Sequence, residues 1–540
     1  MIKIVTVCEP GFFFALAGQA IVEQSLITTF LKNPEVSIRF IMEKNPQDYE
    51  RFTSHFQKEI KEGRVECWEQ SSQKEPFYFK DVDIAILHGV GSLYKWVTFH
   101  RIMNKIPLFI HIHSLELSFQ QRAMLNLPWK IWNTEYPVFF ISPSSSNAQR
   151  LQIVQWLLAL RKRKFPKIQI VPHGFDPSHL VNGSRQIGRN FLGLEETDKV
   201  ILSLNRLTYQ KLDYGQLVLA FHELYQKMNC PSNLKLALVG SASYEDETIN
   251  EKTWVKLIHQ LGLTKNVSIH YRIEEEIKKH IFAAADLYIS IACNPQESFG
   301  IALLEAQAVG LPIVATDWNG YSEVLAEAYK PYLIPTIASN DIGRRMEWSE
   351  SLALLTDAAA PLFNNIVDTC YLLLHNNAIK NELIQKGLEH VSRFTWQDTA
   401  QDLYRLWDIA LNHKNDKEFN DLCTQANIKS KVRLSPNKSN RPETAKPFIT
   451  STVDRLATQY LDNNHLLSLR AVNYQLYLAD YLKHPLYSNL STIITIILPI
   501  LTTRTVKFNE LFGSLDIDYT TYCKIIILLI RRGVIEIVEE

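Results

Sequence analysis

The sequence lacks three features that mark specialised classes of protein. Its 57 lysines and arginines are balanced by 57 aspartates and glutamates, so its overall charge does not point to a nucleic-acid partner. Its seven cysteines show neither C-x-x-C nor Cys/His spacing, which is typical of reduced thiols in a cytosolic protein. Its longest apolar runs, residues 493–501 and 525–530, are far shorter than the ~20 residues that cross a bilayer.

Length and composition indicate a globular enzyme of more than one domain. A chain of 540 residues is too long for one ordinary domain and predicts two domains with an appendage. Hydrophobic residues make up 46% of the chain and charged residues 21%, which is normal for a soluble enzyme. The chain opens directly on a strand-like run, so we expect no signal peptide and a cytoplasmic location.

Short apolar runs alternate with helical segments along most of the chain. Such alternation predicts an α/β fold of parallel sheets covered by helices, with ligands bound beyond the carboxyl ends of the strands. The first half contains candidate strands at residues 2–7, 36–41, 83–87, 108–112, 138–141 and 168–171, and a candidate helix at 17–32. The second half contains candidate strands at residues 200–204, 235–239, 267–270, 287–291 and 313–315.

Residues 295–325 form the most informative stretch. It is predicted to run from a loop containing Glu297 into a helix at 301–309, which ends at Gly310, and then into a short buried strand. Glu305 falls about one turn inside the helix, on the same side as Glu297. Two carboxylates thus lie near a helix N-terminus, where free N–H groups and the helix dipole attract anions. This arrangement suits a ligand with many hydroxyls and a diphosphate.

The stretch PQESFGIALLEAQAVGLPIVATDWNGYSEVL resembles the donor site of retaining GT-B glycosyltransferases of family 4. Their signature is two glutamates with seven residues between them, as in Glu297 and Glu305. The resemblance implies two Rossmann-like domains facing across a cleft. It also implies that Glu297 binds the donor sugar and Glu305 the ribose hydroxyls. The donor-binding loop would comprise Ser298, Phe299, Gly300 and Ile301, the last three through their backbone amides.

The same resemblance assigns two cations to the donor diphosphate. Arg206 and Lys211 follow the first strand of the second half and match the arginine and lysine of the family. Without a metal, two fixed cations must stabilise the leaving nucleoside diphosphate. The sequence has no metal motif, so we expect neither a metal nor a cofactor. Asn205 stands where relatives usually have glycine, and taken alone the two cations read as ordinary surface residues.

Two further candidate residues lie in the first half. His113 ends a strand, as does the family's histidine that faces the donor sugar, and catalysis would then require the cleft to close. Ser114 departs from the glycine or acid that usually follows this histidine. Gly11 follows the first strand and would let the backbone approach a phosphate, although a plain turn explains it equally well.

One helical segment raises the question of a membrane surface. It begins at Asn147, is unusually apolar, and ends at Lys164 after three other basic residues. One interpretation is an amphipathic element that contacts the inner face of a membrane. The other, which we favour, is a core helix whose basic last turn complements the helix dipole, because its polar residues are too few for a broad wet face.

The chain beyond the catalytic resemblance reads as an extra module. The predicted divisions are an acceptor-side domain at 1–177, a nucleotide-sugar domain at 178–394, a crossover helix at 395–412, a polar linker at 413–446 and a winged-helix-like module at 447–540. In the module we expect helices at 452–482, 492–501, 508–515 and 519–532, and a strand at 534–538. The helix at 519–532 has few basic residues, which favours protein docking or self-association over nucleic-acid binding.

The expected function is therefore metal-independent transfer of a sugar, with retention, from a nucleotide-diphosphate sugar to an acceptor that the sequence does not identify. Three alternatives stay open. The first is a catalytically degenerate nucleotide-sugar-binding scaffold acting through the C-terminal module. The second is an epimerase or phosphorylase on the same fold, and the third is a regulator that binds DNA through the module.

Overall fold

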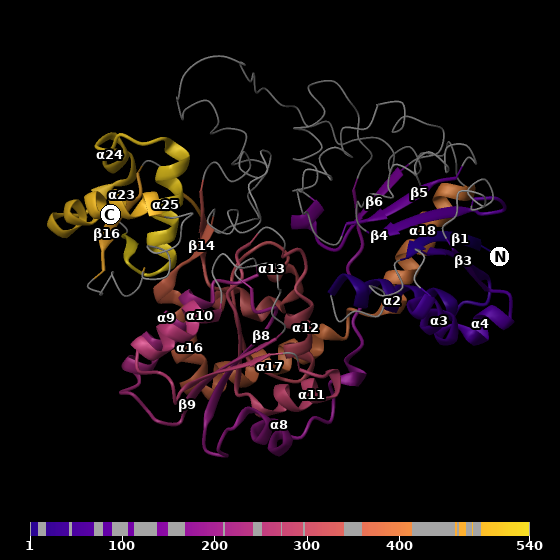
Figure 1. Cartoon of the computed structure of the whole chain (residues 1–540), viewed down its shortest axis with the longest axis horizontal. Coiled ribbons are helices and arrows are strands. Elements are labelled where there is room, and N and C mark those ends of the chain that lie inside the picture. Colours follow the sequence, from indigo (N-terminus) through magenta and orange to yellow (C-terminus); the bar gives the residue numbers. More distant parts are fainter. Residues whose placement is uncertain are drawn as a thin grey trace, which may run out of the picture. The chain divides into compact units, whose positions relative to one another are not determined.

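The computed structural model describes residues 2–8, 18–42, 46–69, 79–88, 106–112, 138–148, 168–208, 211–240, 251–271, 273–294, 297–339, 359–412, 459–461, 464–470, 478 and 488–538. The chain forms two compact units (Figure 1). The first unit comprises Met1–Asp176 and Phe394–Ser435, and the second comprises Pro177–Arg393 and Pro436–Glu540. None of the helices within the described ranges is long and apolar enough to cross a bilayer.

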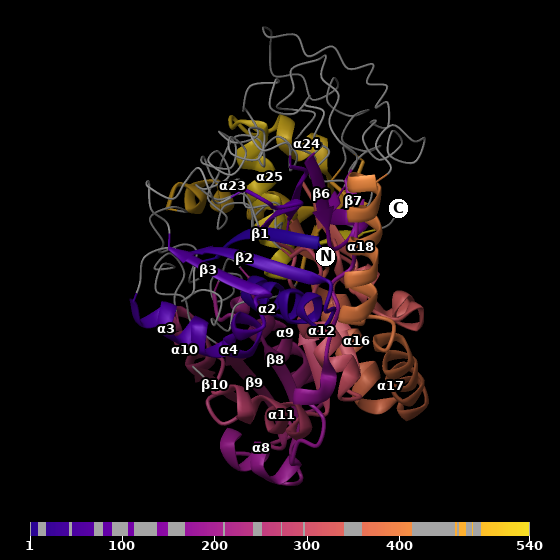
Figure 2. The same cartoon turned by 90° about the vertical axis from the view of Figure 1, so that its right-hand side faces the viewer.

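The first unit is built on a seven-stranded parallel sheet in the order β3-β2-β1-β4-β5-β6-β7. Figure 2 shows β1, β2 and β3 side by side, with α2 along the sheet. The strands are β1 (Ile2–Cys8), β2 (Val36–Met42), β3 (Val65–Glu69), β4 (Ile84–His88), β5 (Leu108–His111), β6 (Val138–Ser142) and β7 (Gln169–Ile170). The helices are α2 (Gly18–Leu31), α3 (Pro46–His55), α4 (Gln57–Lys61) and α18 (Trp396–Asn412).

Helix α18 belongs to the first unit although it follows the second in sequence. The Trp407 ring packs against the Phe30 ring of α2, with 4.9 Å between ring centroids. At the other end of α18, the Thr399 hydroxyl donates to the backbone carbonyl of Pro172 over 2.9 Å. Helix α18 thus packs on α2 near the start of the chain and contacts Pro172 just before the chain leaves the first unit.

All six strands expected in the first half are present, and the structure adds β3, which the sequence did not indicate. β3 lies at the edge of the sheet, where only one side of the strand needs a partner. It contains two charged residues, and one of them, Glu66, accepts from the Arg39 side chain over 2.6 Å and also pairs with Lys3. The strand therefore looks polar in sequence because part of it faces solvent and ionic partners.

The second unit contains a five-stranded parallel sheet in the order β10-β9-β8-β11-β12. The strands are β8 (Lys199–Leu204), β9 (Leu234–Gly240), β10 (Val267–Tyr271), β11 (Leu287–Ser290) and β12 (Ile313–Ala315). All five were expected. The helices are η3 (Pro177–His179), α8 (Arg185–Leu192), α9 (Tyr214–Lys227), α10 (Glu251–Gln260), α11 (Glu275–Ala284), α12 (Ile301–Ala308), α13 (Tyr321–Val324), η4 (Glu327–Tyr332), α16 (Phe363–His375) and α17 (Asn377–Val391).

Strands β8 and β11 lie side by side at the centre of this sheet, in the register Leu287↔Ile201. The strand order reverses between them, because β9 and β10 lie on one side and β12 on the other. In open parallel sheets, loops that leave the carboxyl ends on the two sides of such a reversal diverge and leave room for a ligand. The loops after β8 and β11 carry the predicted cations and Glu297, respectively.

The described C-terminal elements, residues 459–538, form the C-terminal module and belong to the second unit. They are β15 (Gln459–Tyr460), β16 (Leu466–Leu469), α23 (Ser488–Thr503), β17 (Val506–Lys507), α24 (Phe508–Gly513), α25 (Tyr519–Arg531) and β18 (Ile535–Val538). β15 pairs with β13 (Thr336–Ala338), which also pairs with β14 (Ala359–Pro361). β16 lies between β17 and β18 in an antiparallel sheet.

The expected helices at 492–501, 508–515 and 519–532 and the strand at 534–538 are confirmed as α23, α24, α25 and β18. The expected helix at 452–482 is wrong, because 459–460 and 466–469 are strands. The spacing of its leucines is compatible with either a helix or a strand. The pairing of Leu467 with Val506 and Ile537 favours the strand. The resemblance to a winged helix stays a prediction.

Candidate functional site

The loop from Glu297 to Gly300 has a backbone that only glycine permits at its end. Gly300 precedes α12 with φ = 102° and ψ = 52°, in the left-handed region. A Cβ atom at this position would lie 2.8 Å from the Tyr321 ring. No side chain among the described residues caps the first turn of α12. The loop therefore turns sharply into the helix and leaves the helix N-terminus available to a ligand.

Glu297 is held in place through both its side chain and its backbone. Only 6% of the residue is exposed. Its carboxylate forms an ion pair with the Lys211 ammonium and accepts from the Tyr321 hydroxyl over 3.2 Å. Its backbone carbonyl accepts a hydrogen bond from the Asn319 side chain. The carboxylate that resembles the sugar-binding glutamate thus directly contacts one of the two predicted diphosphate cations.

The loop after β8 carries both of those cations. The Lys211 carbonyl accepts from the Asn294 side-chain amide over 2.6 Å, which ties this loop to the segment just before Glu297. The Arg206 carbonyl accepts from the buried Tyr214 hydroxyl over 3.0 Å, while the arginine as a whole is exposed. The backbone of the loop is therefore fixed, whereas the Arg206 side chain extends toward solvent, where an anionic ligand can reach it.

Glu305 forms an ion pair with Lys278, a partner that was not predicted from the sequence. Its Oε1 lies 2.5 Å from Nζ of Lys278 on α11, and the carboxylate is almost completely buried. The only signal in the sequence was a lysine one turn into a helix, which is common. Burial is the main cause of the raised pKa of Tyr288, and the negative charges of Glu305 and Glu297 add to the effect. Both glutamates therefore lie close enough to one tyrosine to raise its pKa.

A group of hydroxyls joins β8, β11 and α13 beneath the glutamates. The Ser290 and Tyr321 hydroxyls are 2.8 Å apart, and the Tyr288 hydroxyl donates to the Leu204 carbonyl over 3.0 Å. Burial, followed by the Glu297 charge, raises the pKa of Tyr321 well above its ordinary value, so both phenols remain neutral hydrogen-bond donors. These residues were not predicted as site residues, because Tyr288 and Ser290 lie in a buried strand and Tyr321 in a short helix, where such side chains are usually part of the core.

Asn205, the departure from the family's glycine, is accommodated in this group. Its side-chain amide lies 3.4 Å from both the Tyr288 and the Ser290 hydroxyl oxygens. The backbone carbonyl of Asn205 packs against Gly240. A Cβ atom at position 240 would lie 1.7 Å from that carbonyl oxygen. Where relatives have a flexible glycine, this chain has an asparagine whose side chain is held by hydrogen bonds. The close approach of β8 to β9 depends on Gly240 of β9.

Several predicted site residues cannot be placed. His113 and Gly11 lie outside the described residues, as does the segment to Lys164 apart from its first two residues. The structure does bring together the candidates of the second unit. These are Arg206, Lys211, Glu297, Ser298, Phe299, Gly300, Ile301 and Glu305, all at the carboxyl edge of the sheet. Within the described part of the chain, no cluster of three or more His, Cys, Asp or Glu side chains is arranged to hold a metal ion.

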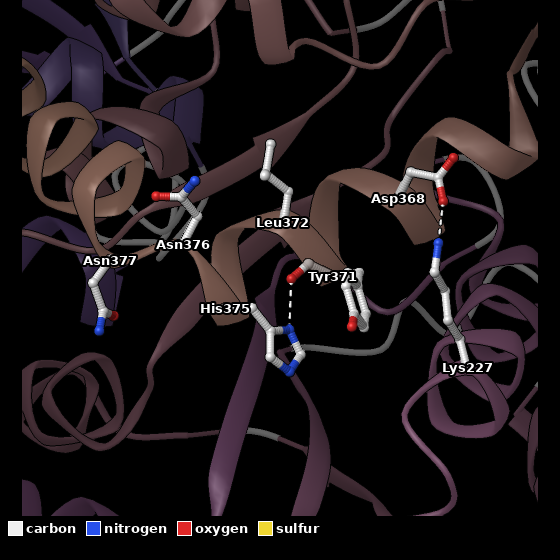
Figure 3. A pocket seen from close by; sticks show the side chains of 7 residues that line it. All are labelled: Lys227, Asp368, Tyr371, Leu372, His375, Asn376 and Asn377. Atoms are coloured by element: carbon white, nitrogen blue, oxygen red, sulfur yellow. Dashed lines mark hydrogen bonds and ion pairs between the residues drawn. The ribbon is translucent and has the colours of Figure 1, made fainter.

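A separate surface hollow lies away from this edge (Figure 3). It is lined by Lys227, Asp368, Tyr371, Leu372, His375, Asn376 and Asn377. Helix α9 begins near the candidate site at Tyr214, and its other end, Lys227, is about 20 Å away at 1.5 Å per residue. Lys227 and Asp368 pair with each other over 2.5 Å, so these two charges of the hollow already compensate one another. The hollow is therefore distinct from the candidate site.

Comparison with known proteins finds similarity to glycosyltransferases. Residues 184–356 match the family model described as "Glycosyl transferases group 1". D-inositol 3-phosphate glycosyltransferase of Segniliparus rotundus is 25% identical over 245 residues, which are 45% of this chain and 47% of that protein. Phosphatidyl-myo-inositol mannosyltransferase of Mycobacterium leprae is 25% identical over 241 residues, 44% of this chain and 52% of that protein. The chain thus spans about half the length of these relatives.

Solved structures share the fold at low sequence identity. The N-terminal domain of Candida albicans trehalose-6-phosphate phosphatase has a TM-score of 0.53 at 13% identity, covering 76% of this chain and 99% of that chain. Sucrose-phosphate synthase from Thermosynechococcus elongatus has a TM-score of 0.51 at 16% identity, covering 75% and 98%. These likenesses concern the fold alone, and the predicted GT-B fold of two Rossmann-like sheets is confirmed. The segment that carries both glutamates and both cations is the one that matches the group 1 glycosyltransferases.

Proposed function

We propose that the protein is a glycosyltransferase that moves a sugar from a nucleotide-diphosphate sugar to an acceptor. The observation that carries this proposal is the ion pair between Lys211 and the buried Glu297, with the Lys278–Glu305 pair beside the same tyrosine. Two buried carboxylates with fixed cations suit a ligand that presents hydroxyls and phosphates together. The match of residues 184–356 to the group 1 glycosyltransferases supports the same activity.

Each residue has a part in this proposal. Arg206 and Lys211 stabilise the charge that develops on the leaving diphosphate, as fixed cations do without a metal. Glu297 accepts from the sugar hydroxyls, and Glu305 accepts from the ribose. The loop of Ser298, Phe299 and Gly300, with the amide of Ile301, approaches the sugar and the phosphates. The roles predicted for His113 at the sugar and for Gly11 at the phosphate are kept as part of this proposal.

The proposed reaction retains the configuration at the anomeric carbon. The bond from that carbon to the phosphate oxygen breaks, and a bond to the acceptor oxygen forms on the same face. The departing phosphate takes the acceptor's proton, so no protein base is needed. Contact of the segment that begins at Asn147 with a membrane remains a prediction.

A thermal-shift panel tests the proposal. A nucleotide that binds the folded protein raises its melting temperature by mass action, so UDP, GDP, ADP, CDP and TDP are compared on the wild type and on Arg206→Ala. We expect one nucleotide to stabilise the wild type and Arg206→Ala to lose that shift. Lys386→Ala is the control, because Lys386 forms an exposed ion pair with Glu389 on α17. If none of the five shifts the wild type, the transferase proposal fails, and so does the alternative of a scaffold that binds nucleotide sugars.

A further inference from the structure

The C-terminal module reaches the loop of Lys211 through a buried ion pair. The Arg532 guanidinium lies 3.1 Å from the Asp213 carboxylate, and the two side chains are 0% and 3% exposed. Asp213 also caps α9, since it accepts from the backbone N–H of Gln216 over 3.1 Å. Lys211 is only two residues away in the chain. The end of α25 therefore holds the same short segment that carries a proposed diphosphate cation.

The preceding arginine reaches the loop of Glu297. The Arg531 guanidinium donates to the Ala359 carbonyl and lies 3.9 Å from the Cys293 sulfur. The residue after Cys293, Asn294, donates to the Lys211 carbonyl over 2.6 Å and accepts from the Trp318 indole over 2.8 Å. Two adjacent arginines at the end of one helix thus contact the two segments that present Lys211 and Glu297. Figure 1 shows α25 beside β14, which contains Ala359.

The fit around these arginines is close. A Cβ atom at Gly215 would lie 2.4 Å from Nη1 of Arg532, so the α9 backbone leaves room for the guanidinium only because this residue is glycine. Gly533 then turns the chain with φ = 64°. The turn lets Arg470 bind both the Gly533 carbonyl and Glu223 of α9, each over 2.7 Å. Arg532 is therefore fixed beside the first turn of α9, and Arg470 is fixed further along the same helix.

The Arg532–Asp213 ion pair is buried, so its loss should disturb the structure around it. A buried charge is tolerated only when it is paired and hydrogen-bonded, and removal of one partner leaves the other uncompensated. Without Arg532, the Asp213 carboxylate would stay buried but would lose the cation that compensates its charge. The segment of Lys211 would then relax toward water, and the hydrogen bond from Asn294 would carry that movement to the loop of Glu297.

We propose that the C-terminal module positions the donor site, with Arg531 and Arg532 as positioning residues that act through Lys211 and Glu297. The inference rests on the proposed transferase function for its substrate, but the structural coupling can be measured separately. It predicts that the module is required for donor binding, although the resemblance to glycosyltransferases ends before it.

The test compares Arg532→Met with Arg504→Met in the full-length chain. Arg504 lies in the same module and pairs with Glu510 over 2.8 Å, but its side chain is 62% exposed. We expect Arg532→Met to weaken binding of the stabilising nucleoside diphosphate by about 10- to 100-fold, because small displacements of binding groups have effects of that size. Arg504→Met should bind as the wild type does. Arg532→Lys, which keeps the charge but loses the fork, should recover part of the affinity.

Hydrogen exchange separates failure of this proposal from failure of the proposed function. Arg532→Met should speed exchange at residues 211–213 and 297–300, measured without nucleotide, while Arg504→Met should not. If exchange speeds up but no nucleotide binds the wild type, the positioning holds and the transferase function fails. If Arg532→Met melts at a lower temperature yet keeps wild-type exchange and affinity below that temperature, the module is only a structural support. Should Arg532→Met not fold, Arg532→Lys is measured in its place, with loss of affinity again expected.

Discussion

Lys278 and Glu305 form an ion pair of 2.5 Å that joins α11 to α12. One carboxylate is therefore both neutralised by the protein and assigned to the ribose. A paired carboxylate can still accept hydrogen bonds from two hydroxyls, because it has about four lone-pair sites. Lys278 thus fixes the orientation of Glu305 without blocking it.

The first prediction concerns Lys278→Met. Removing the ammonium leaves the buried Glu305 carboxylate without this cation, which should cost about 3 kcal/mol of stability. It should also weaken binding of the nucleoside diphosphate by about 10-fold while leaving pyrophosphate, which has no ribose, unaffected. Titration calorimetry with the two ligands measures this difference. Lys279→Met is the control, because Lys279 forms no ion pair among the described residues. Equal losses for both ligands would contradict the ribose assignment.

The second prediction contrasts Glu297→Gln with Arg206→Ala. Glutamine keeps the shape of Glu297 but removes the charge opposite Lys211, so turnover should fall by roughly 100-fold, about 2.7 kcal/mol of transition-state stabilisation. Affinity for the nucleoside diphosphate should stay within about 3-fold, since Glu297 is assigned to the sugar. Arg206→Ala should lower turnover by at least roughly 100-fold and weaken diphosphate binding as well.

Initial rates and equilibrium binding on the same preparations distinguish the two variants. The assignment of Glu297 to the sugar is wrong if Glu297→Gln loses diphosphate affinity as strongly as Arg206→Ala. The assignment of Arg206 to the diphosphate is wrong if its alanine variant keeps wild-type turnover.

The sequence predicted the central part of the site because that part is local. Glu297, Glu305 and the glycine between them lie within nine residues, so one short loop and the helix that follows it place them together. Lys211 and Glu297 are 86 residues apart, but both follow neighbouring strands of a parallel sheet, so topology brings them together. The family resemblance supplied the rest of that assignment.

The partners that escaped prediction are joined by neither helix geometry nor strand order. Arg532 and Asp213 are separated by most of the second unit and by the polar segment that was read as a linker. A basic end of an apolar helix predicts only a favourable interaction with the helix dipole. Lys278 was equally ambiguous, because a lysine in a first turn has no preferred partner. Long-range ion pairs of this kind depend on packing that a single sequence does not reveal.

The third prediction concerns pH and the first unit. Glu23 of α2 is 4% exposed, and its Oε1 has no hydrogen-bond partner among the described residues. Burial raises the pKa of this carboxyl from 4.5 to about 8. A group with a raised folded-state pKa contributes stability that is complete below its unfolded pKa and is lost as pH rises toward the folded one. For Glu23 this window runs from about pH 4.5 to about pH 8.

Stability should therefore fall with rising pH across that window, by at most about 1.4 kcal/mol per pH unit from this group. Glu23→Gln should flatten the dependence and melt at a higher temperature than the wild type at pH 8, with a smaller difference at pH 5. Melting curves at both values measure it. Glu50→Gln on α3, an exposed position, should follow the wild type at both. Parallel pH dependences of Glu23→Gln and the wild type would show that the carboxyl does not stay neutral in the fold.

The last prediction tests the packing of Gly215 against Arg532. Gly215→Ala should lower the stability of the wild type but raise that of an Arg532→Ala variant. Gly215 lies in the first turn of α9, and within a helix alanine is favoured over glycine by up to about 1 kcal/mol. In the wild type, however, the added Cβ would meet the buried guanidinium at 2.4 Å, so Gly215→Ala should destabilise the protein. In an Arg532→Ala background that obstacle is absent, and the same substitution should stabilise it. Gly513→Ala, where a Cβ atom meets nothing within 4 Å, should have the same effect in both backgrounds. Chemical denaturation of the four combinations at Gly215 and Arg532 gives the coupling free energy directly, and additive effects would mean that the arginine moves aside without cost.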